Sequence, residues 1–126
     1  MEFINTAREL LVFTIKLCTK LPKRYDRYFG SDIVKLANKV FDCVVSANDI
    51  FPTSKREATL RLNLLTEASY SLASLIARAS VAEELLTNNE WSPKQIEHWM
   101  ILMASEKKLI TGIRKKDKEK LTKLKE

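Results

Sequence analysis

Hydrophobic residues recur every three or four positions in four stretches of the chain. In the first stretch the series consists of Phe3, Ala7, Leu10, Leu17 and Leu21. This spacing predicts an α-helix with one apolar face, ending before Pro22 because a proline ring interrupts helical hydrogen bonding. No stretch has a convincing strand pattern, so the sequence predicts an all-α fold.

The second helix is predicted between two breaks that contain proline. Ser31 is the expected N-cap, because its hydroxyl can accept a hydrogen bond from an unpaired backbone amide. The helix continues to about Ile50, and Pro52 stops it because the residue before a proline avoids the α conformation. Its apolar positions are Ile33, Leu36, Ala37, Val40, Val44 and Ala47. The preceding residues 22–30 are expected to form a connector.

The third predicted helix is long. Ser54 and Glu57 have the spacing of a capping box, in which the hydroxyl and the carboxylate each accept a hydrogen bond from an unpaired backbone amide. One apolar face then continues to Leu86, and Asn88 and Asn89 mark the expected exit.

A second capping box opens the fourth helix. Ser92 and Gln95 have the required spacing, and Pro93 occupies the first helical position, where its missing amide costs nothing. The helix is predicted to continue to at least Arg114. Residues 114–126 hold seven Lys or Arg and three acids, and they are expected to form either a solvated helical extension or a frayed tail.

Four amphipathic helices joined by short connectors favour a four-helix bundle with up-down-up-down order. The 126 residues suit one domain, which can bury a core without disulfide bonds. We assign the bundle to residues 1–116 and a basic C-terminal extension to residues 117–126.

A run of five consecutive apolar residues extends from Trp99 to Met103. At about 100° per residue such a run surrounds the helix, whereas a bundle buries only one side. Some of these side chains are therefore expected to contact a second copy of the chain. The predicted interface residues are Trp99, Met100, Ile101 and Met103. The alternative is that single apolar side chains are simply exposed, as is common on protein surfaces.

The composition argues against catalysis and against a bound cofactor. Gly30 and Gly112 lie too far apart to form the glycine-rich loops that bind dinucleotides or phosphates. His98 is the only histidine, and Cys18 and Cys43 lack the spacing of zinc or redox motifs. A cysteine–histidine nucleophilic pair would need these residues to meet in space, and nothing in the sequence orients them. We therefore predict two core thiols, no metal, no cofactor and no enzymatic activity.

The sequence contains no candidate membrane span or secretory signal. The longest stretch without a charged side chain, residues 68–77, is far shorter than the roughly 20 apolar residues that cross a bilayer. Glu2, Arg8 and Glu9 interrupt the apolar start, which therefore lacks the continuous apolar region of a signal peptide. The protein is expected to be cytoplasmic, with no membrane partner and with reduced thiols.

Positive charge is concentrated toward the two ends of the chain. The net charge is +6, with six Lys or Arg against three acids in residues 1–30, and ten against five in residues 92–126. The first region contains the candidate nucleic-acid residues Lys23, Arg24 and Arg27, beside Tyr25, Tyr28 and Phe29. Cations hold phosphates and aromatic rings stack on unpaired bases. Equally, lysines near a helix C-terminus complement the helix dipole, and the rings can cap the bundle.

Other candidates for binding nucleic acid or a protein partner lie on the third and fourth helices: Arg56, Arg78, Lys107, Lys108, Arg114, Lys115 and Lys116. Arg61 is left out, because Glu57 four residues earlier can pair with it on a helix. The charged run after residue 114 is either a solvated helix face or a nucleic-acid arm. Asp117, Glu119 and Glu126 are expected to dilute its lysines.

Three features bear on family membership. They are LPKR at residues 21–24, followed by aromatic residues and a glycine; the long third helix; and a last helix that opens with SPKQIEHW at residues 92–99 and ends with LITGIR at residues 109–114. Together they resemble the four-helix-bundle family of the accessory variability determinant of diversity-generating retroelements and the proteins encoded in intervening sequences of bacterial large-subunit ribosomal RNA genes. The last segment looks most like the accessory variability determinant.

This resemblance implies a homopentameric barrel of four-helix protomers that binds a reverse transcriptase together with RNA or DNA. It implies a non-enzymatic role in copying template RNA into mutagenised cDNA, and it supplies no catalytic residue. The alternative function is a self-assembling scaffold of the intervening-sequence type, whose charge serves solubility alone.

Overall fold

The computed structural model describes residues 2–86 and 90–124, and these residues form helices and short connections with no strand. The long helices are α1 (Glu2–Cys18), α3 (Ser31–Asn48), α4 (Lys55–Leu85) and α5 (Pro93–Lys123). A short α2 (Lys23–Tyr25) and a π-helical turn η1 (Asp26–Gly30) lie between α1 and α3. The predicted all-α fold is confirmed.

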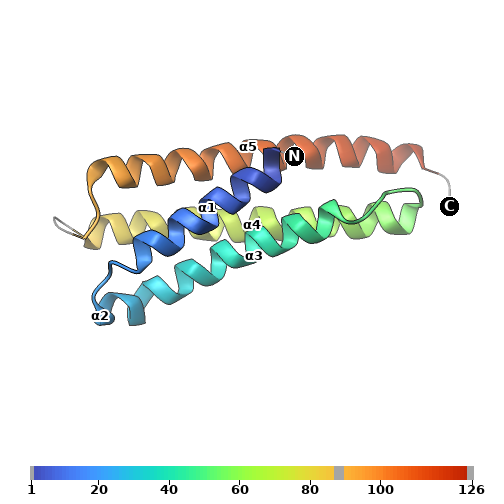
Figure 1. Ribbon diagram of the computed structural model, residues 1–126. Helices are drawn as coiled ribbons and strands as arrows, with labels where there is room; N and C mark the ends of the chain where they lie inside the picture. The colour runs from blue at the N-terminus through green and yellow to red at the C-terminus, as the bar shows by residue number, and fades with distance from the viewer. Residues whose placement is uncertain (1, 87–89, 125–126) are drawn as a thin grey trace.

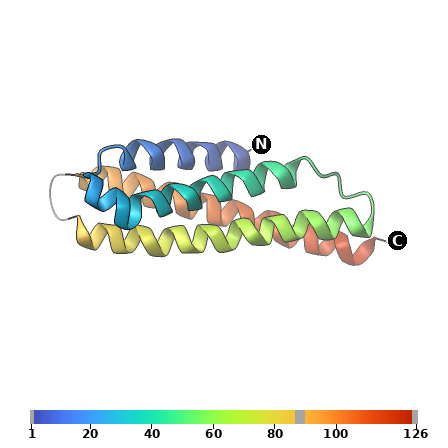
Figure 2. The same cartoon turned by 90° about the horizontal axis from the view of Figure 1, so that it is seen from below.

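The four long helices of the described chain pack side by side as a bundle (Figures 1 and 2). α3 contacts α1 and α4, and α5 contacts the same two helices. The connection from α1 to α2 and the last turn of α4 lie at one end of the bundle, whereas the α3–α4 connection and the last turn of α5 lie at the other (Figure 1). The last turns of α5 extend beyond the start of α1.

The core consists of the apolar faces that the three- and four-residue spacing indicated. Leu10, Ile33 and Leu72 are at most 1% exposed, and Cys18 is also buried. Cys43 is half-buried at the edge of the core. In the described residues, no helix combines the length and the apolar character that crossing a membrane requires.

Two tryptophans tie the start of α5 to α1 through hydrogen bonds inside the core. The indole of Trp99 donates to the Thr14 hydroxyl at 2.9 Å, and that hydroxyl donates to the Leu10 carbonyl at 2.6 Å. The Trp91 indole donates to the Leu17 carbonyl at 2.8 Å, and its ring meets Trp99 edge-on at 5.3 Å. These bonds satisfy the buried polar atoms of both rings and fix the register of α1 against α5.

The predicted cap at Ser31 is wrong, because the chain is already helical before it. The helical path starts at Lys23, after Pro22 with its extended ψ of 152°, and Ser31 itself has helical angles of −59° and −43°. The π-helical turn occupies residues 26–30 and continues into α3. A β-carbon on Gly30 would lie 2.8 Å from the Asp26 carboxylate, so glycine allows this close packing.

The two predicted capping boxes are formed to different extents. At α5, Ser92 and Gln95 make both reciprocal hydrogen bonds, and Pro93 begins the helix as expected. At α4, the Ser54 hydroxyl accepts from the Glu57 amide at 3.2 Å. The Glu57 carboxylate accepts from the hydroxyls of Thr53 and Ser54, and these bonds lower its pKa. α4 ends at Leu85, and the predicted exit at residues 88–89 lies outside the described residues.

The boundary expected between residues 116 and 117 is absent from the structure. α5 continues without a break to Lys123, in agreement with the helical alternative for the tail. Asp117 is only 6% exposed and pairs with Arg61 of α4 at 2.7 Å. Residues 117–123 therefore continue the helix that packs in the bundle and do not form a separate extension.

Candidate nucleic-acid interface

The first group of predicted residues forms a compact surface that we call the basic corner: Lys23, Arg24 and Arg27. All three are exposed, and none forms an ion pair with another described residue. The Arg24 guanidinium lies 4.8 Å from the centre of the Tyr25 ring. The short α2 and the π-helical turn η1 thus present three unneutralised cations at one end of the bundle (Figure 1).

The aromatic residues beside the basic corner divide between the two roles considered from sequence, which are base stacking and closing the end of the bundle. Phe29 is buried and Tyr25 is half-buried, with their ring centres 5.5 Å apart, so this pair closes the end of the bundle. Tyr28 is 75% exposed and makes no ring contact with a described residue. Its ring is available to stack on a base.

A second basic surface lies at the opposite end, where the start of α4 meets the end of α5. Arg61 on α4 and Asp117 on α5 pair there, which places Arg56 beside the last turns of α5. We call this surface the basic end. Its exposed members are Lys55, Arg56, Lys115, Lys116, Lys118, Lys120 and Lys123. Sequence reasoning had assigned three of these seven, and it left out Lys118, Lys120 and Lys123 because it treated the run after residue 116 as diluted by acids.

That expectation of dilution is wrong for Asp117, because its charge is already neutralised. Asp117 accepts from the Arg61 guanidinium at 2.7 Å, and Arg61 also donates to the carbonyls of Ala47 and Ile50 at 3.3 and 3.4 Å. The predicted pairing of Arg61 with Glu57 is therefore also wrong. Between residues 107 and 123, Glu119 is then the remaining exposed acid.

The remaining candidates are less uniform. Lys107 and Lys108 are exposed along the middle of α5. Arg78 lies 3.6 Å from Asp32 in a half-exposed ion pair, which offsets its charge. Arg114 is half-buried, and its Nε is enclosed without a hydrogen-bond partner in the described part of the chain. These two arginines are therefore less available to a phosphate than the lysines of the basic end.

The structure does not bring all predicted residues into one site. α4 contains 31 residues, and at 1.5 Å per residue it spans roughly 45 Å. The basic corner and the basic end lie at opposite ends of this length (Figures 1 and 2). A small ligand cannot contact both surfaces, whereas a polynucleotide can.

The predicted oligomer interface needs correction. Trp99 and Met103 are 0% and 1% exposed, so they belong to the core of the single chain and are not available to a second copy. Met100 is half-buried, and Ile101 is 54% exposed. Trp99 is buried because α1 packs against this part of α5, which the pattern of α5 alone did not reveal.

A different uncharged surface lies on the outer face of α4. Tyr70, Val81 and Leu85 are between 51% and 68% exposed. Ala73 and Ala77, also exposed, lie at helical spacing between Tyr70 and Val81. We call these five residues the α4 stripe; sequence reasoning did not single them out.

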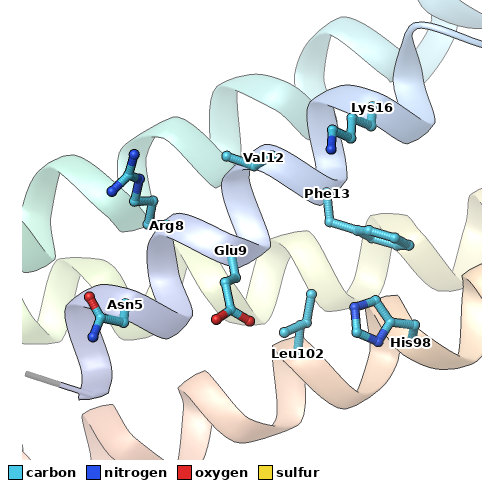
Figure 3. Close-up of a pocket in the computed structure, with 8 residues that line it drawn as sticks. All are labelled: Asn5, Arg8, Glu9, Val12, Phe13, Lys16, His98 and Leu102. Atoms are coloured by element: carbon cyan, nitrogen blue, oxygen red, sulfur yellow. The ribbon is translucent and has the colours of Figure 1, made fainter.

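A groove lies between α1 and α5, and the sequence analysis did not predict it (Figure 3). Phe13 of α1 meets the ring of His98 of α5 edge-on, with ring centres 4.7 Å apart. Arg8, Glu9 and Lys16 of α1 line the same groove. No local signal could have found this pairing, because Phe13 and His98 are 85 positions apart and meet only after the bundle forms.

The cysteines are poorly suited to nucleophilic chemistry. Burial raises the pKa of the Cys18 thiol to about 12, and it also raises the pKa of Cys43. A thiol with such a pKa carries almost no thiolate, the reactive form, near neutral pH. Within residues 2–86 and 90–124, no three His, Cys, Asp or Glu side chains gather in a way that could hold a metal ion.

Comparisons with protein-family models, curated proteins and solved structures found no match for this chain. The resemblance to the accessory variability determinant stays a prediction that depends on the three sequence features described above.

Proposed function

We propose that this protein is a non-enzymatic accessory protein that binds structured RNA and associates with a retroelement reverse transcriptase to support mutagenic cDNA synthesis. The observation that supports RNA binding is the basic end. Seven exposed Lys or Arg side chains gather there, and the Asp117 carboxylate is neutralised by Arg61. Such a surface attracts polyphosphates and releases their counterions on binding.

The type of recognition follows from the side chains. Lysines on the outside of rigid helices contact phosphates, which position a nucleic acid but carry no sequence information directly. We therefore expect weak sequence selectivity. The up-down-up-down order is supported by the positions of the helix ends in Figure 1, and it places a basic surface at each end of the bundle.

The reverse-transcriptase partner comes from the resemblance alone. The segments at residues 21–24, 92–99 and 109–114 carry it. A bundle with two separated basic surfaces suits a protein that holds RNA near a polymerase, because one surface can bind RNA while other faces stay available to the enzyme.

The basic end should contribute most of the RNA affinity. We expect replacement of Lys115, Lys116 and Lys118 with Gln to weaken binding to a structured RNA by roughly tenfold or more at low salt. The slope of log affinity against log salt should fall by about one for each lost phosphate contact. Filter binding across a salt series measures both quantities, and circular dichroism checks that the helix content is unchanged.

Replacing the basic corner (Lys23, Arg24 and Arg27) with Ala should also weaken binding, because these three cations are exposed and form no ion pair with a described residue. We expect a smaller loss of RNA affinity than for the variant of the basic end, because the basic end has more than twice as many cations. A larger loss from the corner variant would move the principal RNA surface to that end of the bundle.

A matched control also removes three positive charges, but from a different face of the bundle. Lys35, Lys39 and Arg78 are exposed on α3 and α4, and two of them already pair, Lys39 with Glu67 at 3.2 Å and Arg78 with Asp32. Replacing all three with Gln should lower affinity far less than either test variant. Equal losses in all three variants would show that net charge alone controls binding, and would contradict a defined interface.

The second candidate function is a self-assembling scaffold without a direct role in nucleic-acid binding. The α4 stripe favours it, because an exposed, largely uncharged helix face suits contact with another protein chain. The resemblance to the accessory variability determinant implies a homopentamer. Assembly is compatible with both candidate functions, so RNA binding is what distinguishes them.

In dilute solution the protein should be a stable oligomer, with a pentamer as the proposed form. The exposed α4 stripe and Ile101 provide the apolar surface for assembly. Light scattering measures the mass directly, and replacing Val81 and Leu85 with Gln should lower it. A mass near 14.5 kDa for the unmodified protein at micromolar concentration would contradict assembly.

A further inference from the structure

The groove between α1 and α5 combines three kinds of chemistry within a volume of about 460 Å³ (Figure 3). Its aromatic part is the edge-on pair of Phe13 and His98, with ring centres 4.7 Å apart. Glu9 supplies a carboxylate from α1, and its side chain points toward α5 in Figure 3. Arg8 and Lys16 line the α1 side and are exposed. The volume falls within the usual range for small-ligand sites.

We propose that this groove binds one unpaired base of an RNA strand, which rests on the RNA binding proposed above. The base stacks against the exposed ring of His98, which Phe13 supports from the side. Lys16 and Arg8 contact the flanking phosphates. The Glu9 carboxylate accepts hydrogen bonds from amino or imino groups on the base edge, so a base with donor groups on that edge is preferred.

Exposed cations follow one another in the chain from the groove to the basic corner. Lys16 lies near the end of α1, Lys20 lies in the turn after α1, and Lys23 of the corner begins α2. All three side chains are exposed. A single strand can therefore follow these cations from the basic corner to the groove. Two cations, Arg8 and Lys16, line the groove beside one carboxylate, that of Glu9. This excess of positive charge favours a ligand that carries phosphates over a peptide helix with few acidic residues.

The test compares a short single-stranded RNA with a duplex of the same sequence, because stacking needs an unpaired base. We expect His98→Ala to weaken single-strand binding by roughly tenfold and to leave duplex binding unchanged. Phe51→Ala is the matched control, since Phe51 is also an exposed aromatic residue but lies in the connection between α3 and α4. It should leave both affinities unchanged.

Photocross-linking gives a second readout that needs no substitution. Single-stranded RNA that carries thiouridine should cross-link to peptides from α1 or from the first turns of α5, as identified by mass spectrometry. Cross-links confined to residues 107–123 would overturn the groove assignment while leaving RNA binding at the basic end intact.

Three results would refute the base-binding groove in distinguishable ways. If His98→Ala and Phe51→Ala have equal effects, the groove binds no base although the protein binds RNA. If His98→Ala weakens only the binding of a reverse transcriptase, the groove is a protein-docking surface. If the unmodified protein binds neither RNA, the proposed function fails together with the groove.

Discussion

Replacement of Glu106 with Gln should increase the free energy of unfolding by about 3 kcal/mol at pH 7 and should have almost no effect near pH 4.5. Glu106 is fully buried, and neither carboxylate oxygen has a hydrogen-bond partner among residues 2–86 and 90–124. Burial raises the pKa of this carboxyl from 4.5 to about 8. The folded protein therefore keeps a proton on Glu106 that the unfolded chain releases at neutral pH.

The direction of the pH dependence follows from these two values. Below about pH 4.5 the carboxyl is protonated in both states, and the folded protein has its full stability. As the pH rises from 4.5 to 8, the unfolded chain loses the proton first, so the free energy of unfolding falls by about 1.4 kcal/mol per unit. Above pH 8 both states are ionised, and this contribution becomes constant.

Urea unfolding at pH 5, 7 and 8.5, followed by circular dichroism, measures the effect. The difference between Glu106→Gln and the unmodified protein should grow with pH up to about 8. Glu119→Gln serves as the control, because Glu119 is exposed on the same helix and should change stability little at any of these pH values. A constant difference across the series would contradict a protonated Glu106 in the folded protein.

Replacement of Asp117 with Asn should lower the free energy of unfolding by about 3 kcal/mol. Asp117 and Arg61 are 6% and 14% exposed, so their ion pair is largely buried. Without the carboxylate, the Arg61 charge stays enclosed between α4 and α5, and its remaining partners among the described residues are the carbonyls of Ala47 and Ile50. Removing one partner of a buried pair is costly for this reason.

A double variant separates the loss of the pair from the loss of a packed side chain. Arg61→Met combined with Asp117→Leu removes both charges and keeps apolar volume, so it should recover most of the stability lost in Asp117→Asn. Thermal and urea unfolding of the three proteins at one pH test this. An Asp117→Asn variant as stable as the unmodified protein would show that the pair does not hold α5 to α4.

The helices and their core faces could be predicted because they depend on local spacing. The apolar series of α1 predicted the burial of Phe3, Ala7, Leu10 and Leu17. The capping box at Ser92 depends on residues three positions apart, and it forms as expected. The same periodicity could have identified Glu106, which lies three positions after Met103 and four before Ile110, on the buried face of α5.

Apart from the local error at Ser31, the errors concern contacts between residues that are distant in the sequence. Arg61 has an acid at helical spacing in Glu57, yet it pairs with Asp117, 56 positions away. The ion pair between Arg61 and Asp117 neutralises one acid of the basic end. It also holds residue 117 against α4, so the boundary expected after residue 116 is absent. The groove at Phe13 and the burial of Trp99 have the same origin, since both depend on how α1 lies against α5.

The affinity of the unmodified protein for a structured RNA, measured by filter binding across a salt series, decides whether the basic surfaces bind nucleic acid. With about five phosphates neutralised per binding unit, the affinity should fall by roughly a hundredfold or more between 50 and 200 mM salt. An RNA of unrelated sequence and similar structure should give nearly the same curve. No detectable binding at 50 mM salt would contradict the proposed function and would favour the scaffold.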